Sequence, residues 1–472
     1  MSRILIASLL LVGCAPPTDL ENTNPGLLLG RPVDVTSRRV LSAAGDRVEV
    51  AARVPHAAPH AGAVGGWNYD VQGPINGGPA LFTASFSAGN CSDMLYVPIN
   101  TDSVPNLYAF TNLYNNCPQG VDRFSPARCD TTLGHCPTVA WLDLLAGRFD
   151  GNAAVTSFDG SELYVTTTAG RAYALRTSAG QIDANFDANN DLGVSDATFV
   201  DNAPWVDYPT GNLYVAVSYG ANKKSALYKF DSKGNKLAMI KLPAGIASTP
   251  IYYLGYVYLA TLDGRVAKLV DQGSTFTAVD APWPLTLQSN QPIVSVPSID
   301  ADNNLIFATA GDRLGMATLA GDIKAMLKIS AVPGMTTTPS SSTLDLTSHA
   351  LFVGHEGKLW RVPYTTTGFG SATSTLTRGT GLGNEDPRSS PLLLEASPTQ
   401  RFVFIGDGGG FLNRFAADAL TNRAVFPSGA ASTGIGGPID GSIFVDYLGG
   451  NLYFGGGTGA TKVYQVTQVG LN

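Results

Sequence analysis

From residue 67 onward, short apolar runs come in pairs separated by a turn. Examples are 163–175 (LYVTTTAGRAYAL) and 257–269 (VYLATLDGRVAKL), in which two β-rich runs flank a few turn residues. Such a pair predicts a β-hairpin. Eight hairpins are predicted in this way, at 95–110, 163–175, 213–230, 257–269, 305–319, 351–362, 402–415 and 452–466.

The hairpins recur at a nearly constant interval. Successive hairpins begin 44 to 51 residues apart, except that the second begins 68 residues after the first because of an insertion at 111–138. Such a period, with several strands per repeat, is typical of a β-propeller. The sequence therefore predicts an all-β, eight-bladed β-propeller over 67–472. Seven blades is the alternative, if the divergent first or second unit is not a blade.

Each repeat also predicts one strand before its hairpin and one after it, which makes four-stranded blades. A proline such as Pro79, Pro250 or Pro391 opens the inner strand, where no ladder donor is needed. Apolar segments such as 236–242 (KLAMIKL) predict the outer strand. The last repeat has no room for an outer strand, so we expect 67–73 (WNYDVQG) to complete that blade and close the ring.

The repeat pattern W-x-Y/F, G-x-x, P, LYV and DG-x-LYAL resembles that of pyrroloquinoline-quinone-type propellers. This family includes quinoprotein dehydrogenases and non-enzymatic relatives, among them the lipoprotein propeller of the outer-membrane β-barrel assembly machine. The resemblance implies the fold, because propellers host many unrelated functions. In the dehydrogenases an adjacent cysteine pair helps to hold the quinone. No adjacent pair occurs here, so we expect no bound quinone.

Composition and charge narrow the class of protein. The 472 residues include 53 Gly and 29 Pro, and only 14% are charged. These values exclude a helical bundle and a disordered chain. The net charge of −7, without a dense basic cluster, argues against nucleic acid as a partner.

The N-terminus resembles a bacterial lipoprotein signal. Arg3 precedes an apolar run that is too short to span a bilayer and that ends in Leu-Val-Gly-Cys at 11–14. The resemblance implies that residues 1–13 are a cleaved signal peptide and that Cys14 carries the lipid, so the membrane is reached through this anchor only. The alternative is an ordinary secretory signal that contains a cysteine.

The Pro- and Ala-rich residues 14–66 predict a flexible tether between the anchor and the propeller. Ala15 and Pro16 follow the cysteine where an inner-membrane lipoprotein of enterobacteria has Asp. By that resemblance we expect an outer-membrane lipoprotein of the bacterial cell envelope, facing the periplasm or the cell surface.

Four further cysteines, Cys91, Cys117, Cys129 and Cys136, predict two disulfides in an exported chain. Three pairings are open. In a propeller, the loop with Cys91 and the insertion 111–138 share one face, so we expect Cys91 to pair with one insertion cysteine. A long stapled loop of this kind is often a recognition element.

A candidate calcium site lies at 187–196 (DANNDLGVSD). Asp187, Asn189, Asp191 and Asp196 offer alternating oxygen ligands on a turn, as calcium requires. Leu192 stands where an EF-hand loop has its invariant glycine. The segment is more similar to the D-x-N-x-D-G-x-x-D loop of calcium-binding propeller adhesins at pilus tips, with one residue inserted. The alternative is a polar Asx-turn loop.

The remaining chemistry-bearing residues favour structural roles. Most of the five tryptophans fall at strand positions where the family uses Trp to dock neighbouring blades. His349, His355 and Glu356 lie close in sequence without a metal-ligand spacing, and we interpret them as surface residues. No nucleophile elbow, phosphate-binding loop or zinc-protease motif is present.

Three functions remain open at this point. The first is a non-catalytic scaffold that binds other envelope proteins, with the insertion as a contact. The second is a propeller enzyme, a quinoprotein-like dehydrogenase or a carbohydrate-acting protein, with a channel site built from several blades. The third is a calcium-binding surface adhesin.

Overall fold

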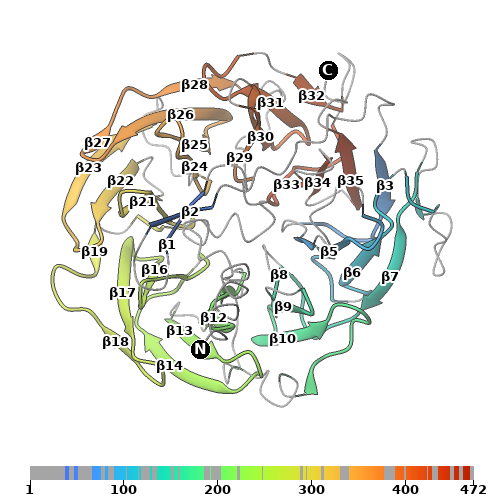
Figure 1. The fold of residues 1–472 in the computed structure, drawn as a ribbon, viewed down its shortest axis with the longest axis horizontal. Helices are drawn as coiled ribbons and strands as arrows, with labels where there is room; N and C mark the ends of the chain where they lie inside the picture. The colour runs from blue at the N-terminus through green and yellow to red at the C-terminus, as the bar shows by residue number, and fades with distance from the viewer. Residues whose placement is uncertain are drawn as a thin grey trace, which may run out of the picture.

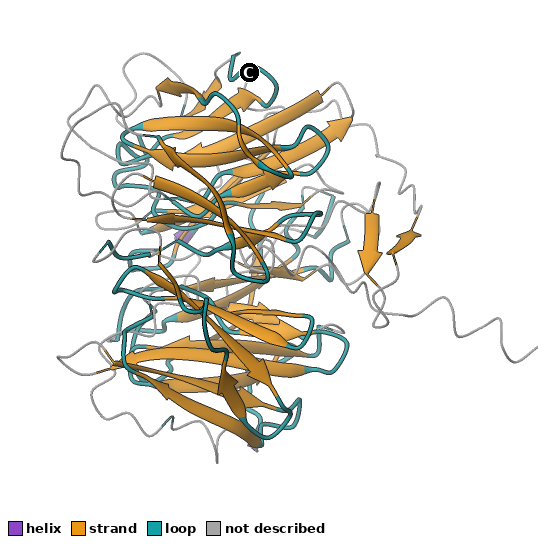
Figure 2. Cartoon of the chain, turned by 90° about the vertical axis from the view of Figure 1, so that its left-hand side faces the viewer, coloured by secondary structure: helices purple, strands orange, loops and turns teal. Residues whose placement is uncertain are grey.

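The structure is a computed structural model that describes residues 38–41, 47–50 and, with gaps in several loops, 66–467. Within these ranges nearly all regular structure is β-strand (Figure 2). The predicted signal peptide, Cys14 and most of the tether lie outside the described residues, as do the four predicted calcium ligands. No helix among the described residues is long and apolar enough to cross a membrane.

The described strands form a two-stranded hairpin, β1 (Arg38–Leu41) with β2 (Arg47–Val50), and eight larger antiparallel sheets. We number these sheets 1 to 8 by the chain order of their innermost strands. The innermost strands are β4 (Ala80–Phe82), β8 (Ala154–Thr156), β11 (Trp205–Asp207), β15 (Ile251–Tyr253), β20 (Ser298–Ile299), β24 (Thr343–Asp345), β29 (Leu392–Ser397) and β33 (Phe444–Asp446).

The second and third strands of each sheet are the predicted hairpins. The second strands are β5 (Met94–Pro98), β9 (Glu162–Thr167), β12 (Asn212–Tyr219), β16 (Tyr256–Ala260), β21 (Asn304–Thr309), β25 (Ala350–His355), β30 (Gln400–Gly406) and β34 (Asn451–Gly455). The third strands are β6 (Leu107–Thr111), β10 (Arg171–Arg176), β13 (Lys224–Phe230), β17 (Arg265–Asp271), β22 (Arg313–Thr318), β26 (Lys358–Thr365), β31 (Leu412–Ala416) and β35 (Lys462–Thr467).

The outer strands complete seven of the sheets. They are β7 (Thr138–Asp143), β14 (Lys236–Leu242), β18 (Phe276–Ala278) with β19 (Leu285–Thr286), β23 (Ile323–Lys328), β27 (Gly368–Phe369) with β28 (Thr373–Leu376), β32 (Ala424–Phe426) and β3 (Trp67–Asp70). The expected four-stranded pattern is therefore confirmed in these sheets, two of which split the outer strand in two.

Sheet 2 departs from the pattern, because its described residues form three strands. Beyond β10 the chain makes one isolated bridge, Leu175 with Ile182, instead of a fourth strand. Phe186, which follows this bridge in the chain, packs against Tyr164 of β9 and Phe230 of β13. Its ring is therefore buried between sheets 2 and 3.

The N-terminal strand completes the last sheet, as predicted. β3 pairs antiparallel with β35, with Trp67 opposite Gln465 and Asp70 opposite Lys462. Figure 1 shows the sheets arranged around a common centre, with β24, β29 and β33 near the middle and β7, β14 and β28 at the rim. The two ends of the described body thus meet in one sheet.

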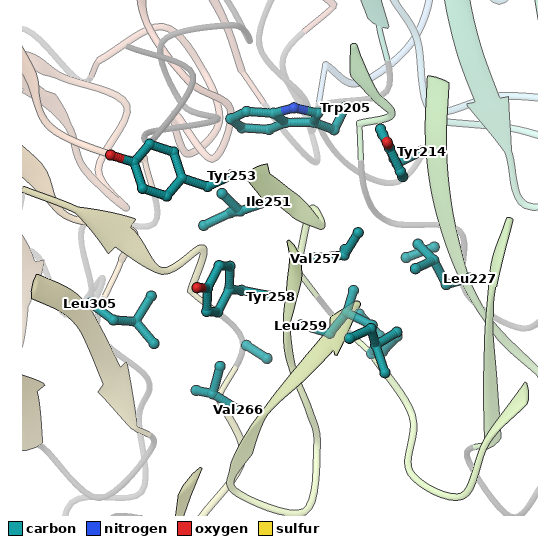
Figure 3. Packing of buried hydrophobic residues seen from close by; sticks show 14 of the residues in the cluster. Trp205, Tyr214, Leu227, Ile251, Tyr253, Val257, Tyr258, Leu259, Val266 and Leu305 are labelled. Atoms are coloured by element: carbon teal, nitrogen blue, oxygen red, sulfur yellow. The ribbon is translucent and has the colours of Figure 1, made fainter. Parts of the chain in front are cut away.

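Hydrophobic clusters join each sheet to the next. One cluster joins sheet 8 to sheet 1 through Trp67, Tyr453 and Leu95. Another runs through sheets 3, 4 and 5, where Trp205, Ile251 and Tyr258 pack together (Figure 3). Because the inner sheet strands are covered on both faces, they read as continuous apolar runs; all six residues of β25 are buried.

Candidate binding site at the chain junction

The four cysteines of the described body form two disulfides. Cys91, in the loop between β4 and β5, is bonded to Cys117, and Cys129 is bonded to Cys136. The expectation that Cys91 pairs with an insertion cysteine is confirmed. The second bond closes a short loop within the insertion. The first bond therefore fixes the N-terminal part of the insertion 111–138, which lies between β6 and β7, to the β4–β5 loop of sheet 1.

The base of the insertion contacts both chain ends through one carbonyl group. The Leu113 carbonyl oxygen accepts a hydrogen bond from Trp67 Nε1 at 3.0 Å and another from Gln465 Nε2 at 2.9 Å. Trp67 and Gln465 are opposite each other in the pairing of β3 with β35. The two lone pairs of a single buried carbonyl thus accept hydrogen bonds from β3 and β35, the strands nearest the two ends of the chain.

Further hydrogen bonds hold this base in place. Thr111 Oγ1 donates to the Cys91 carbonyl at 2.8 Å, and Tyr114 Oη donates to Asp93 at 2.6 Å. Burial raises the pKa of Tyr114, and the nearby Tyr453, Asp446 and Asp93 add to the rise. Tyr114 therefore stays a neutral donor at physiological pH.

The outer part of the insertion has described anchors as well. Arg128 Nη1 donates to Tyr108 Oη at 3.2 Å, and His135 Nε2 lies 2.7 Å from the Asn112 carbonyl. Cys129 forms an isolated β-bridge with Tyr69 of β3. A rigid base with a loop fixed at several points can present side chains to a partner at low entropic cost.

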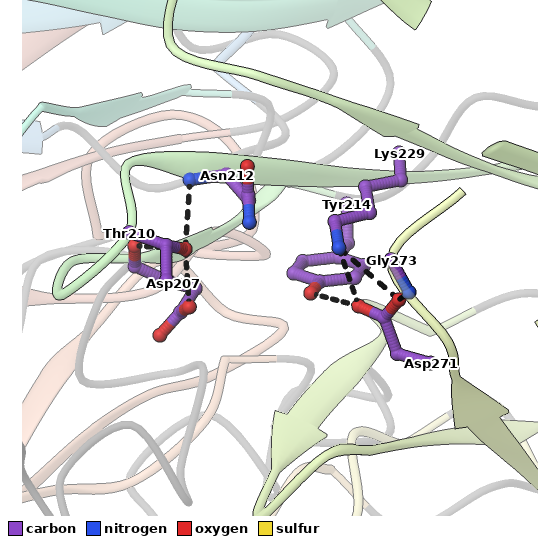
Figure 4. Close-up of polar contacts among 7 residues, drawn as sticks. All are labelled: Asp207, Thr210, Asn212, Tyr214, Lys229, Asp271 and Gly273. Atoms are coloured by element: carbon purple, nitrogen blue, oxygen red, sulfur yellow. Dashed lines mark hydrogen bonds and ion pairs between the residues drawn. The ribbon is translucent and has the colours of Figure 1, made fainter. Parts of the chain in front are cut away.

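A second polar cluster joins sheets 3 and 4 and was not predicted from the sequence (Figure 4). Lys229 Nζ lies 2.8 Å from Asp271 Oδ2, and both side chains are almost fully buried. Asp271 also accepts from Tyr214 Oη at 2.5 Å and from the Gly273 amide at 2.8 Å. Burial raises the pKa of Tyr214, and so does its hydrogen bond to Asp271. The four groups form a satisfied latch between two sheets.

A comparable ion pair joins sheets 6 and 7. Arg401, the second residue of β30, contacts Asp345 at the end of β24 and lies 2.9 Å from Asp418. Asp345 is fully buried, whereas Asp418 is largely exposed. This pair connects the innermost strand of sheet 6 with the second strand of sheet 7, whereas Lys229 and Asp271 lie on the third strands of sheets 3 and 4.

The surface interpretation of His355 and Glu356 is wrong. The side chain of His355 is completely buried and that of Glu356 is 3% exposed, with His355 Nε2 3.7 Å from Glu356 Oε1. The physical reason is that His355 ends β25, a strand enclosed between neighbouring sheets, so its position next to a turn does not expose it. His349, in the preceding turn, lies against the Tyr364 ring.

The tryptophans dock neighbouring sheets, as expected. Trp67 and Trp205 are fully buried, and Trp141 and Trp283 nearly so. Trp141 Nε1 donates to the Thr177 carbonyl and Trp283 Nε1 to the Ala320 carbonyl, each across a sheet boundary. All five tryptophans are described; four of them are enclosed between sheets, so they do not offer a free ring face on which a quinone could stack.

The metal prediction lies in a part of the chain that the structure leaves undescribed. Asp187, Asn189, Asp191 and Asp196 are outside the described residues, which place only Leu192, buried in the cluster between sheets 2 and 3. Among the described residues no group of His, Cys, Asp or Glu is arranged to hold a metal ion.

Comparison with known proteins yields structural likeness only. No family model matches the sequence, and no curated protein matches it. The quinohemoprotein alcohol dehydrogenase ADHIIG from Pseudomonas putida HK5 superposes with a TM-score of 0.55 at 11% identity, over 86% of this chain and 76% of that one. A europium-containing methanol dehydrogenase gives 0.55 at 10% identity, over 84% and 85%. BamB from Moraxella catarrhalis gives 0.48 at 16% identity, over 70% and 87%.

The fold inference depends on the two dehydrogenases, since the BamB superposition is weaker. At identities of 10 and 11% their likeness establishes the fold and carries no information about substrate. The chain is therefore similar in fold to the pyrroloquinoline-quinone-type β-propellers, as the repeat pattern predicts.

Proposed function

We propose that the protein is a lipid-anchored β-propeller of the bacterial cell envelope that binds other envelope proteins without catalysing a reaction. In this proposal the eight sheets are the blades of one closed ring. Residues 1–13 are removed, Cys14 carries the lipid, and the segment up to 66 tethers the ring to the outer membrane.

The observation that carries the proposal is the insertion 111–138, whose base is fixed where β3 meets β35. The Cys91–Cys117 disulfide and the Leu113 carbonyl fix the base of the insertion to sheets 1 and 8, and the Cys129–Cys136 disulfide closes a short loop near its C-terminal end. In addition, the buried ionisable groups of sheets 3, 4, 6 and 7 are used to join sheets. Their arrangement suits a rigid scaffold better than a reacting centre.

The proposal is tested by affinity capture from detergent-solubilised envelope. In one variant residues 119–127 are replaced by a Gly/Ser segment of equal length, which leaves all four cysteines in place. The matched control is Met239→Ser, because Met239 is 48% exposed on β14 and lies outside the insertion. We expect an envelope protein captured by the wild type and the control to be lost from the insertion variant. An unchanged set of captured proteins in all three would refute the role of the insertion.

A further inference from the structure

The first strand of the described body occupies an edge that needs outside support. β3 contributes four residues to sheet 8, and one of its edges pairs with β35. On the other edge the described residues place the isolated bridge between Tyr69 and Cys129 of the insertion. A four-residue edge strand gains little from its ladder alone and opens easily.

The chain enters β3 under tight steric constraint. A Cβ built on Gly66 would lie 1.9 Å from the Gln465 carbonyl oxygen, so glycine alone allows the two terminal strands to approach this closely. The Trp67 ring then packs against Phe110 and Tyr453, with ring centroids 5.9 and 6.1 Å away. The surroundings of this ring therefore help to hold β3 in place, together with the packing of the buried Tyr69 ring against Phe110.

The Cys91–Cys117 disulfide helps to fix the segment that carries the Leu113 carbonyl. Cys91 also accepts a hydrogen bond from the Asn112 amide through its carbonyl oxygen, at 3.1 Å. Leu113 is thus held between a hydrogen bond at residue 112 and a covalent bond at residue 117. Without the covalent bond, the segment 112–117 gains conformational freedom, and only the hydrogen bonds of neighbours such as Asn112 and Tyr114 still hold the carbonyl shared by Trp67 and Gln465.

We propose that the Cys91–Cys117 disulfide is a reduction-sensitive clasp that holds β3 in sheet 8. While the bond is closed, the Leu113 carbonyl joins β3 to β35. When a dithiol reduces the bond, β3 loosens from the ring. The rest of the ring, which is held by its own inter-sheet clusters, stays folded.

The reduction is an ordinary thiol–disulfide exchange. One thiolate of the dithiol attacks Sγ of Cys91, which is half-buried, whereas Cys117 is only 7% exposed. The sulfur–sulfur bond breaks, a mixed disulfide forms at Cys91, and Cys117 leaves as a thiolate that takes up a proton. The second thiolate of the reductant then displaces Cys91, which is protonated in turn, and the reductant ends as a cyclic disulfide.

Hydrogen–deuterium exchange read by mass spectrometry tests the clasp on the full chain. The wild type is measured oxidised and after treatment with dithiothreitol, and iodoacetamide labelling shows which cysteines are open. The variant Cys91→Ser/Cys117→Ser isolates this bond from Cys129–Cys136. We expect residues 67–70 to exchange roughly tenfold or more faster in both cases, because the shared carbonyl no longer holds the strand. Residues 212–242 of sheet 3 should be unchanged.

The control is Lys229→Met, which weakens sheets 3 and 4 and leaves the junction intact. It should raise exchange at 212–242 without singling out 67–70. The proposal is overturned if 67–70 keep their protection when the bond is absent, or if protection falls equally in all sheets. It is also overturned if dithiothreitol leaves Cys91 and Cys117 unlabelled in the folded protein.

Discussion

The buried ion pair between Lys229 and Asp271 offers a quantitative test of how neighbouring sheets are joined. The side chains are 6% and 3% exposed, so removing one charge leaves the other without a partner in a poorly solvated place. Breaking a buried pair in this way costs about 3–5 kcal/mol. Lys229→Met should lie near the lower limit, because Asp271 keeps its hydrogen bonds from Tyr214 and Gly273.

The double variant Lys229→Met/Asp271→Leu separates the interaction between the two charges from the contribution of each side chain. It removes both charges and leaves the Tyr214 hydroxyl without an acceptor, a cost of about 1–3 kcal/mol. The double variant should therefore be no less stable than Lys229→Met and clearly more stable than the sum of the two single changes predicts. Asp271→Leu alone should lower the free energy of unfolding the most, since it removes the partner of both the Lys229 ammonium and the Tyr214 hydroxyl.

Urea unfolding followed by tryptophan fluorescence measures these free energies, and Trp205 and Trp283 lie in the same cluster as Tyr214. The reasoning is refuted if Lys229→Met changes the free energy of unfolding by less than about 1 kcal/mol. It is equally refuted if the single changes add up in the double variant, because additivity means that the two groups do not interact.

Three further predictions concern pH, calcium and the membrane anchor. Burial raises the pKa of Asp207, so the folded state holds the Asp207 proton more tightly than the unfolded state does. The free energy of unfolding should therefore fall as pH rises from about 4 toward 7, and this fall should be smaller in Asp207→Asn when both proteins are unfolded in urea. An equal or steeper fall in the variant contradicts the prediction. If Asp187 and Asp191 bind calcium, the wild type should melt at a higher temperature in millimolar calcium than with chelator, and Asp187→Ala should abolish this difference. Identical melting curves of the wild type with calcium and with chelator refute the site. Cys14→Ser should move the protein from the membrane to the soluble fraction, and unchanged fractionation would contradict lipidation.

Much of the fold could be predicted because each repeat carries its own strand pattern. The hairpin at 95–110 becomes β5 and β6, and the segment 67–73 supplies β3 in the last sheet. Sheet 2 was harder, because nothing local shows that the described residues after β10 form an isolated bridge and not a fourth strand. The burial of Phe186, which follows, depends on Tyr164 and Phe230 in two other strands.

The junction contacts and the inter-sheet latches could not be predicted, because they depend on residues far apart in the chain. Gln465 reaches Leu113 across 352 positions, and Lys229 reaches Asp271 across 42. His355 shows the same limit, since all six residues of β25 are buried although the last of them stands next to a turn. A sequence signal was nevertheless available for the disulfides, since the face shared by Cys91 and the insertion follows from strand order alone.

Site-specific photo-crosslinking in living cells tests the central claim, that the insertion binds an envelope protein. A benzophenone-bearing residue replaces Phe124 in the insertion and, as the matched control, Met239 on the exposed outer strand β14. The account predicts a discrete adduct of higher mass from position 124 that is missing from position 239. No adduct from position 124, or the same adducts from both positions, would contradict it.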